Sequence, residues 1–219
     1  PNINIKGAKI KITNSKKIQT LDLEGFIKIN DNYDKFKVNE KYNYDKKYFD
    51  IDGYFDLTNS KVEFNQLNYI KNNGIKSKLE FKTNFALDNY YKIIELNFLE
   101  GKNKINLVNV NLNKNFELTD FKTFNIKTYN KGVVNNDFTV KKLEEVTILG
   151  EVFDAQPLLK SIFKTNNKKT FSKNFNEEIK INFKKALTGT NDDILNFAMI
   201  ATIKKGSFNK LSLKGNFSE

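Results

Sequence analysis

Apolar and polar residues alternate along most of the chain. A period of two places successive side chains of a strand on opposite faces, so that one face packs on a core and the other meets water. Turn-forming Asn, Asp, Ser and Gly residues separate the alternating runs at intervals of about 8–12 residues, as in antiparallel meanders and sandwiches. The clearest runs are Ile10/Ile12, Leu21/Leu23, Ile27/Ile29, Phe36/Val38, Tyr42/Tyr44, Phe55/Leu57 and Val62/Phe64.

Two hairpins stand out, with turns at Gly101 and Gly206. Within the first, the apolar parity changes after Leu107 to Val108 and Val110. A change of parity inside a strand predicts a β-bulge at Leu107–Val108, which bends the strand and increases its twist. The strands therefore predict an all-β fold with a long, curved antiparallel sheet, either a groove or an open sandwich.

The segment Gly150–Lys164 departs from strand alternation and predicts one short helix near residues 155–164. Asp154 is a suitable N-cap, and Pro157 falls in the first turn, where a missing N–H costs nothing. The helix would carry an apolar stripe at i, i+3 and i+4 spacing and would cover an open end or edge of the sheet. The stripe consists of Leu158, Leu159, Ile162 and Phe163.

The 219 residues suffice for one large all-β domain or two small ones. The chain has only two prolines and no linker rich in Pro, Gly or Ser, so we expect a single continuous β-rich domain over residues 1–219. Because all but one of the nine tyrosines lie at or before Tyr91, a weak boundary near residues 75–90 is conceivable. The chain begins with Pro1 and its one methionine is Met199, so we expect a fragment of a longer protein.

The composition excludes most of the common types of enzyme active site. The chain has no cysteine, histidine, tryptophan or arginine, and all 37 basic residues are lysines. Ser–His and Cys–His nucleophiles and the usual zinc ligands are therefore absent, and no phosphate-binding glycine motif is present. We predict a protein that is not an enzyme, without cofactor or metal. A carboxylate-based hydrolase is a distant alternative that would need Asp50, Asp52 or Asp56 to meet another carboxylate.

The net charge of +11 has two interpretations. A basic chain can bind nucleic acid, but arginine, the preferred residue for phosphate and guanine, is absent. The lysines are spread over the whole chain, as expected for the solvated faces of strands. The 20 phenylalanines likewise suit core packing better than base stacking. We therefore expect no nucleic-acid partner, while a weak attraction to anionic lipid head groups stays open.

The run Ile148–Leu159 resembles the G-x-x-F-D-x-x-P/G-L-L motif of the AsmA-like family of envelope proteins. In that family a strand ends at the motif and a short helix follows. Leu211-Ser-Leu213-Lys-Gly215 is similar to the L-x-L-x-G pattern found downstream, and the resemblance covers about residues 90–217. It implies a repeating β-groove that shields phospholipid acyl chains in the periplasm of a Gram-negative bacterium. Lipid would move between the inner and outer membranes, with an inner-membrane anchor outside this chain.

Such a groove would hold acyl chains by non-directional burial, at about 0.8 kcal/mol per CH₂ group. An exported β-sandwich that binds a protein or glycan is the alternative, because strand alternation alone does not distinguish an open trough from a closed core. The residues expected to line the groove are Leu96, Phe98, Ile105, Leu107, Phe197, Met199, Ile203, Leu211 and Leu213.

Overall fold

The computed structural model describes residues 4–86, 90–164, 176–190, 192–205 and 207–217. These residues form strands joined by turns, with one α-helix, α1 (Gln156–Lys164), and one short 3₁₀ helix, η1 (Asn65–Leu67). The prediction of an all-β fold with a curved sheet and one short helix is confirmed. The chain forms two compact units, which are Pro1–Glu63 with Ile70–Lys122, and Phe64–Tyr69 with Thr123–Glu219.

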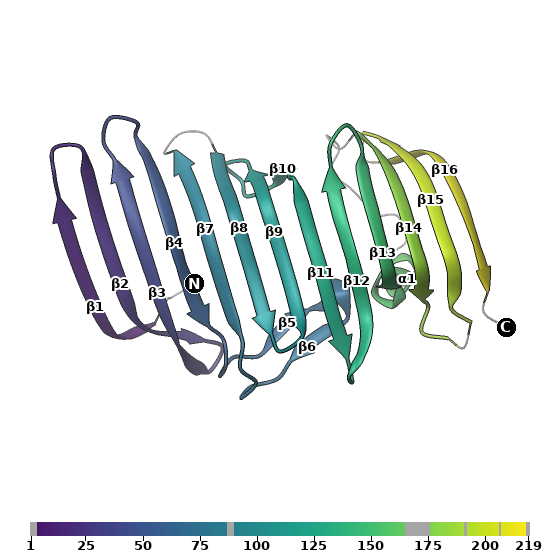
Figure 1. The fold of residues 1–219 in the computed structure, drawn as a ribbon, viewed down its shortest axis with the longest axis horizontal. Helices are drawn as coiled ribbons and strands as arrows, with labels where there is room; N and C mark the ends of the chain where they lie inside the picture. Colours follow the sequence, from purple (N-terminus) through teal and green to yellow (C-terminus); the bar gives the residue numbers. More distant parts are fainter. Residues whose placement is uncertain (1–3, 87–89, 165–175, 191, 206, 218–219) are drawn as a thin grey trace. The chain divides into compact units, whose positions relative to one another are not determined.

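The first unit is an antiparallel meander in which each long strand pairs with the next one along the chain (Figure 1). Tight turns reverse the chain at Asn30 and Gly101, whose φ angles of 54° and 53° suit Asn and Gly. In order, its long strands are β1 (Ile5–Asn14), β2 (Ile18–Ile29), β3 (Asn32–Asn43), β4 (Tyr48–Asp56), β7 (Lys78–Ala86), β8 (Tyr90–Glu100) and β9 (Asn103–Leu112), and the short β10 (Leu118–Asp120) pairs with β9.

The hairpin predicted around Gly101 is formed by β8 and β9. The bend in β9 lies at Asn109, directly after the predicted bulge at Leu107–Val108. Asn109 adopts a left-handed backbone with φ 50°. The N–H of Lys122 donates to the carbonyl oxygens of Val108 and Asn109, at 3.2 Å each. Leu107 and Val110 consequently both face the apolar side. The sequence shows the change of parity, but because valines stand at both 108 and 110 it does not show at which residue the backbone bends.

A longer segment between β4 and β7 carries β5 (Val62–Phe64), η1 and β6 (Tyr69–Lys71), with β5 and β6 paired as a small separate sheet. Its two ends belong to the first unit, where the N–H of Leu57 donates to the Ser77 carbonyl at 3.0 Å. Its middle, Phe64–Tyr69, belongs to the second unit.

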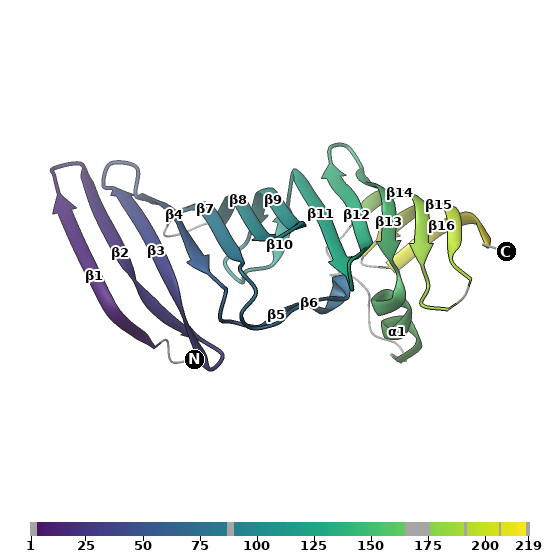
Figure 2. The ribbon, with the colours of Figure 1, turned by 60° about the horizontal axis from the view of Figure 1, so that its bottom comes forward.

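The second unit pairs its strands in chain order, and the hairpin predicted around Gly206 is formed by its last two strands. One pair departs from the expected antiparallel arrangement, because β13 and β14 run parallel. A tight hairpin cannot join parallel neighbours, so the connection needs a longer crossover, and α1 lies within it (Figure 2). The strands are β11 (Thr123–Asn130), β12 (Val133–Lys142), β13 (Val146–Asp154), β14 (Glu177–Leu187), β15 (Ile194–Lys204) and β16 (Ser207–Phe217).

Candidate functional site

The strand register gives the sheet of the first unit one apolar and one polar face. One row of cross-strand partners from β2 to β9 is Leu23, Val38, Gly53, Phe81, Leu96 and Leu107. The neighbouring row, on the opposite face, is Asp22, Asn39, Asp52, Lys82, Glu95 and Val108. Because side chains alternate between the faces of a strand, this register separates apolar from charged positions across the unit.

Burial along the apolar face of the first unit is uneven. Phe36, Phe98 and Ile105 form one row near the β2–β3 and β8–β9 turns and are only 2%, 1% and 7% exposed. The middle rows, including Val38 and Leu96, are half-buried. On β1, Ile10 and Ile12 are exposed. A second sheet packed on this face would bury its middle rows most deeply, so within the described residues the face is open there.

A buried polar cluster lies at the end of this face where Phe36, Phe98 and Ile105 are buried, which we call the closed end. The Asp34 carboxylate accepts the N–H of Asn59 at 2.8 Å and the hydroxyl of Ser60 at 2.5 Å. The ammonium group of Lys71 donates to the carbonyl oxygens of Thr58 and Ser60, at 3.0 and 2.6 Å, and also to that of Leu57. Asp34, Ser60 and Lys71 are almost completely buried, so these contacts fix the segment that follows β4 against the sheet.

Two opposing influences act on the pKa of Lys71. Burial lowers this pKa below its ordinary value of 10.5, and the nearby carboxylates of Asp34, Glu100 and Asp56 oppose the shift. The three carbonyl acceptors match the three N–H donors of the ammonium group. The cluster therefore has the properties of a structural cation site that the chain fills with its own lysine.

At the opposite end of the same face, six aromatic side chains form a continuous row. Tyr42, Phe49, Phe85 and Tyr91 are successive cross-strand partners on β3, β4, β7 and β8. Their ring centroids lie 4.4, 4.7 and 5.6 Å apart in that order. Tyr44 extends the row at one end and Phe116 at the other, with centroid distances of 5.0 and 4.6 Å to their neighbours. We call these six residues the aromatic row.

Glu40 interrupts the apolar face. Its cross-strand partners are Leu21 on β2 and Ile51 on β4, so its carboxylate projects on the side of the apolar side chains. The residue is half-buried. Sequence alternation already indicated this position, because Glu40 shares the parity of Phe36, Val38 and Tyr42. We did not single it out there.

The second unit also has one apolar face. The row Phe124, Val140, Ile148, Ile181, Met199 and Leu213 crosses all six strands from β11 to β16. Phe138, Phe153 and Phe183 pack together with ring centroids 5.1–5.8 Å apart. Ala201 and Ile203 are fully buried, whereas Leu211 and Leu213 on β16 are 52% and 56% exposed. The described part of this face is therefore closed at Ala201 and Ile203, half-open at Met199 and open at β16.

The nine residues predicted to line a groove divide between the two units. Leu96 faces Leu107, and Phe98 faces Ile105, on the apolar face of the first unit. Phe98 and Ile105 are buried, so Leu96 and Leu107 are the more accessible of the four. The other five, which are Phe197, Met199, Ile203, Leu211 and Leu213, lie on β15 and β16 of the second unit.

The predicted helix cap is close to the observed one. The Asp154 carboxylate accepts the N–H of Gln156, the first residue of α1, at 3.1 Å. It also accepts the side-chain amides of Asn68 and Asn135, at 2.9 and 3.3 Å, and is fully buried. On the helix, Leu158 is 47% exposed and Leu159 is half-buried. The side chains of Ile162 and Phe163 lie outside the described residues.

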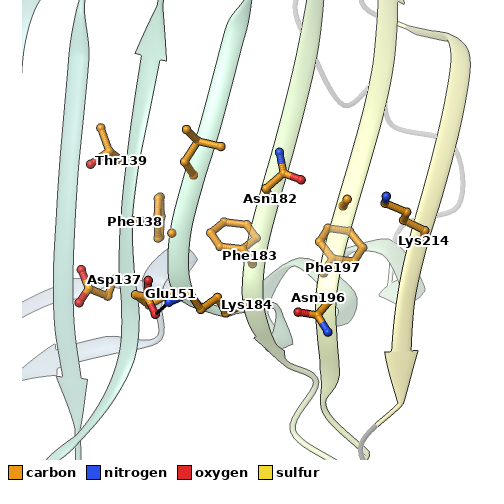
Figure 3. A pocket seen from close by; sticks show the side chains of 13 residues that line it. Asp137, Phe138, Thr139, Glu151, Asn182, Phe183, Lys184, Asn196, Phe197 and Lys214 are labelled. Atoms are coloured by element: carbon orange, nitrogen blue, oxygen red, sulfur yellow. Dashed lines mark ion pairs between the residues drawn. The ribbon is translucent and has the colours of Figure 1, made fainter.

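A shallow depression lies on the second unit over β12–β16 (Figure 3). Its two carboxylates are both paired with lysines. Glu151 lies 2.8 Å from Lys184, and Asp137 lies 2.6 Å from Lys127, whose pKa is raised by this hydrogen bond. Two ion-paired carboxylates on a solvated face have the properties of surface salt bridges, which contribute little to stability.

The aspartates considered for hydrolysis lie on the polar face of the first unit. Asp52 accepts the side-chain amide of Asn39 at 2.9 Å, and Asp50 is the cross-strand partner of Lys41 and Asn84. Asp56 accepts the N–H of Thr58 at 2.9 Å. Among the described residues, no group of three or more acidic, Cys or His side chains could hold a metal ion. The carboxylates of Asp52 and Asp56 therefore accept local hydrogen bonds of the sheet and its turns, and Asp50 lies beside Lys41 on the same polar face.

Comparison of the chain with protein-family models, with curated proteins and with solved structures gives no match. Among the described residues, no helix combines the length and apolar character needed to cross a membrane.

Proposed function

We propose that the chain is a non-enzymatic segment of an AsmA-like envelope protein whose apolar sheet faces shield phospholipid acyl chains during transport between two membranes. The observation that carries the proposal is the half-buried middle of the apolar face in the first unit, where the row that contains Val38, Phe81 and Leu96 has no second layer among the described residues. Apolar side chains left open to water gain free energy when an acyl chain covers them.

The second support is local. The resemblance over Ile148–Leu159 implies a strand that ends at the motif and a helix that follows. Here β13 ends at Asp154 and α1 begins at Gln156. A periplasmic location and an inner-membrane anchor outside this chain belong to the proposal, because they come with the resemblance.

Lipid binding is tested on the intact chain by native mass spectrometry after purification from cells, followed by titration with a fluorescent phospholipid. Leu96 and Asn97 are adjacent on β8 and face opposite sides of the sheet. We expect Leu96→Lys to abolish saturable binding and Asn97→Lys to leave it unchanged, since only the first places a new charge on the apolar face. Absence of co-purified lipid together with absence of saturable binding would exclude the proposal.

A second candidate function is binding of a protein partner through a sheet edge. It is favoured by β16, which among the described strands pairs with β15 alone and is exposed from Ser207 to Phe217. Extended peptides add to such edges through main-chain hydrogen bonds. Because the N–H groups of adjacent strand residues point to opposite sides, one of the variants Leu211→Pro and Ser212→Pro removes a main-chain donor from the free edge of β16. That variant would weaken a β-edge complex and spare lipid binding on the first unit.

A further inference from the structure

One end of the first unit combines the aromatic row with a group of lysines. The β1–β2 and β3–β4 turns lie at this end (Figure 1) and carry Lys16, Lys17, Lys46 and Lys47, which we call the basic turns. The two turns are joined by hydrogen bonds: the N–H of Tyr44 donates to the Lys17 carbonyl at 2.9 Å, and its hydroxyl donates to Asn14 at 3.2 Å. A residue of the aromatic row therefore holds the basic turns together.

The charge at this end is weakly neutralised. Asp45 is the one carboxylate in the two turns, and it lies 3.7 Å from Lys17 in an exposed pair. Within the described part of the chain, Lys16, Lys46 and Lys47 have no carboxylate at ion-pair distance, and all three are exposed. The basic turns are thus free to meet an anionic surface.

The aromatic row is partly open to solvent beside these lysines. Phe116 is 65% exposed and Tyr44 is 37% exposed, and the rings between them are half-buried. Tyrosine prefers the boundary between water and hydrocarbon, because its ring is apolar and its hydroxyl forms hydrogen bonds. Lysines near an anionic leaflet add attraction that acts within about 10 Å.

We infer that this end of the first unit docks on the surface of an anionic lipid bilayer, with the aromatic row at the level of the head groups and the basic turns on the lipid phosphates. The inference goes beyond acyl-chain shielding, since a protein can dock on a bilayer without extracting lipid. The two activities are related by position. The apolar face is closed at its other end by Asp34, Ser60 and Lys71, so docking brings the open end to the membrane.

The test is sedimentation of the full chain with vesicles of phosphatidylcholine alone and with vesicles that also contain phosphatidylglycerol. At low salt we expect at least about tenfold tighter binding to the anionic vesicles, and we expect high salt to weaken it. Equal binding to both vesicle types, or no binding to either, would overturn the inference.

Two matched pairs of variants locate the docking end. K16Q/K17Q/K46Q is expected to lower anionic-vesicle affinity at least about tenfold. K76Q/K102Q/K104Q removes the same charge from exposed lysines at the opposite end of the strands and should change it little. F116N removes the most exposed ring of the aromatic row, at a position whose φ of 61° Asn tolerates, and should also weaken binding. I75N, at the opposite end, should not.

Circular dichroism verifies that each variant is folded. Equal losses in the two lysine triples would show a diffuse charge effect, and an unchanged F116N would show that the aromatic row makes no contact. Either result would overturn the inference. Neither pair of variants alters the middle of the apolar face, so a failure here is distinguishable from a failure of acyl-chain binding.

Discussion

The ring of Phe81 on β7 lies over Gly53 on β4, its cross-strand partner on the apolar face of the first unit. A Cβ atom added at Gly53 would come within 3.1 Å of the Phe81 ring and 2.2 Å of the Lys37 carbonyl oxygen. The glycine leaves room for the aromatic side chains of neighbouring strands. Phe81 also stacks on Phe55 with a centroid distance of 5.6 Å.

We therefore expect Gly53→Ala to lower the free energy of unfolding by about 1–3 kcal/mol, because the backbone oxygen of Lys37 cannot move aside as a side chain could. Urea denaturation monitored by circular dichroism measures the effect. Asp52→Ala, at the adjacent exposed position, serves as the control and should cost less than about 0.5 kcal/mol. Equal effects of the two substitutions would contradict this account of Gly53.

Much of the fold of each unit was predictable because period-two alternation fixes which residues share a face. The pairs Leu96–Leu107 and Met199–Leu213 follow from two short turns and that parity. The parallel pair β13–β14 was not predictable, because it depends on a long crossover that brings Ile179 beside Val146. Local sequence patterns do not specify where such a crossover ends.

The candidate site was predictable in part for the same reason. Parity placed the predicted groove residues on apolar faces, yet it carries no information about what covers them. Phe98 and Ile105 are buried at the closed end of their face, whereas Leu96 is half-buried. Lys71 was also missed, since one lysine among 37 shows no sign in the sequence of a partner such as Asp34.

Lys71 gives a second prediction. Lys71→Met keeps a similar volume but leaves the carbonyl oxygens of Leu57, Thr58 and Ser60 without their buried donor. We expect a loss of about 3–5 kcal/mol in the free energy of unfolding, because each buried acceptor left without a donor costs about 1–3 kcal/mol. Lys76→Met, in an exposed position of the same segment, is the control for the chemical change. Comparable stability of K71M and K76M would contradict a structural role for the cluster.

The pH dependence of the same residue gives a third prediction. Burial lowers the pKa of Lys71 in the native state, while the unfolded chain keeps the ordinary value of 10.5. As pH rises, the native state releases this proton first, so the unfolded state binds more protons over that interval and the free energy of unfolding rises with pH. The difference in stability between the natural chain and K71M should therefore grow as pH approaches 10.5. A difference that shrinks would show that the carboxylates outweigh burial.

Asp154 supplies a fourth prediction in the second unit. Its carboxylate meets three donors, from Asn68, Asn135 and the N–H of Gln156. Asp154→Asn places an amide group against at least one of these donors, so we expect a loss of about 1–3 kcal/mol in the free energy of unfolding. Thermal and urea denaturation measure it, with the exposed Asp22→Asn as the control. An unchanged stability of D154N would mean that the buried cluster reorganises without cost.

Glu40 tests whether lipid lies across the middle of the apolar face. Its carboxylate lies between Leu21 and Ile51 in the cross-strand row, where an acyl chain on this face would have to pass. Glu40→Leu removes the charge and adds apolar area between Leu21 and Ile51, so we expect phospholipid affinity to rise about tenfold, which corresponds to about 1.4 kcal/mol. Glu40→Gln separates charge from apolar area and should give a smaller gain. Fluorescent-phospholipid titration measures both variants. If affinity is the same for the natural chain and both variants, the bound lipid lies elsewhere, and acyl-chain shielding would then have to rest on the second unit.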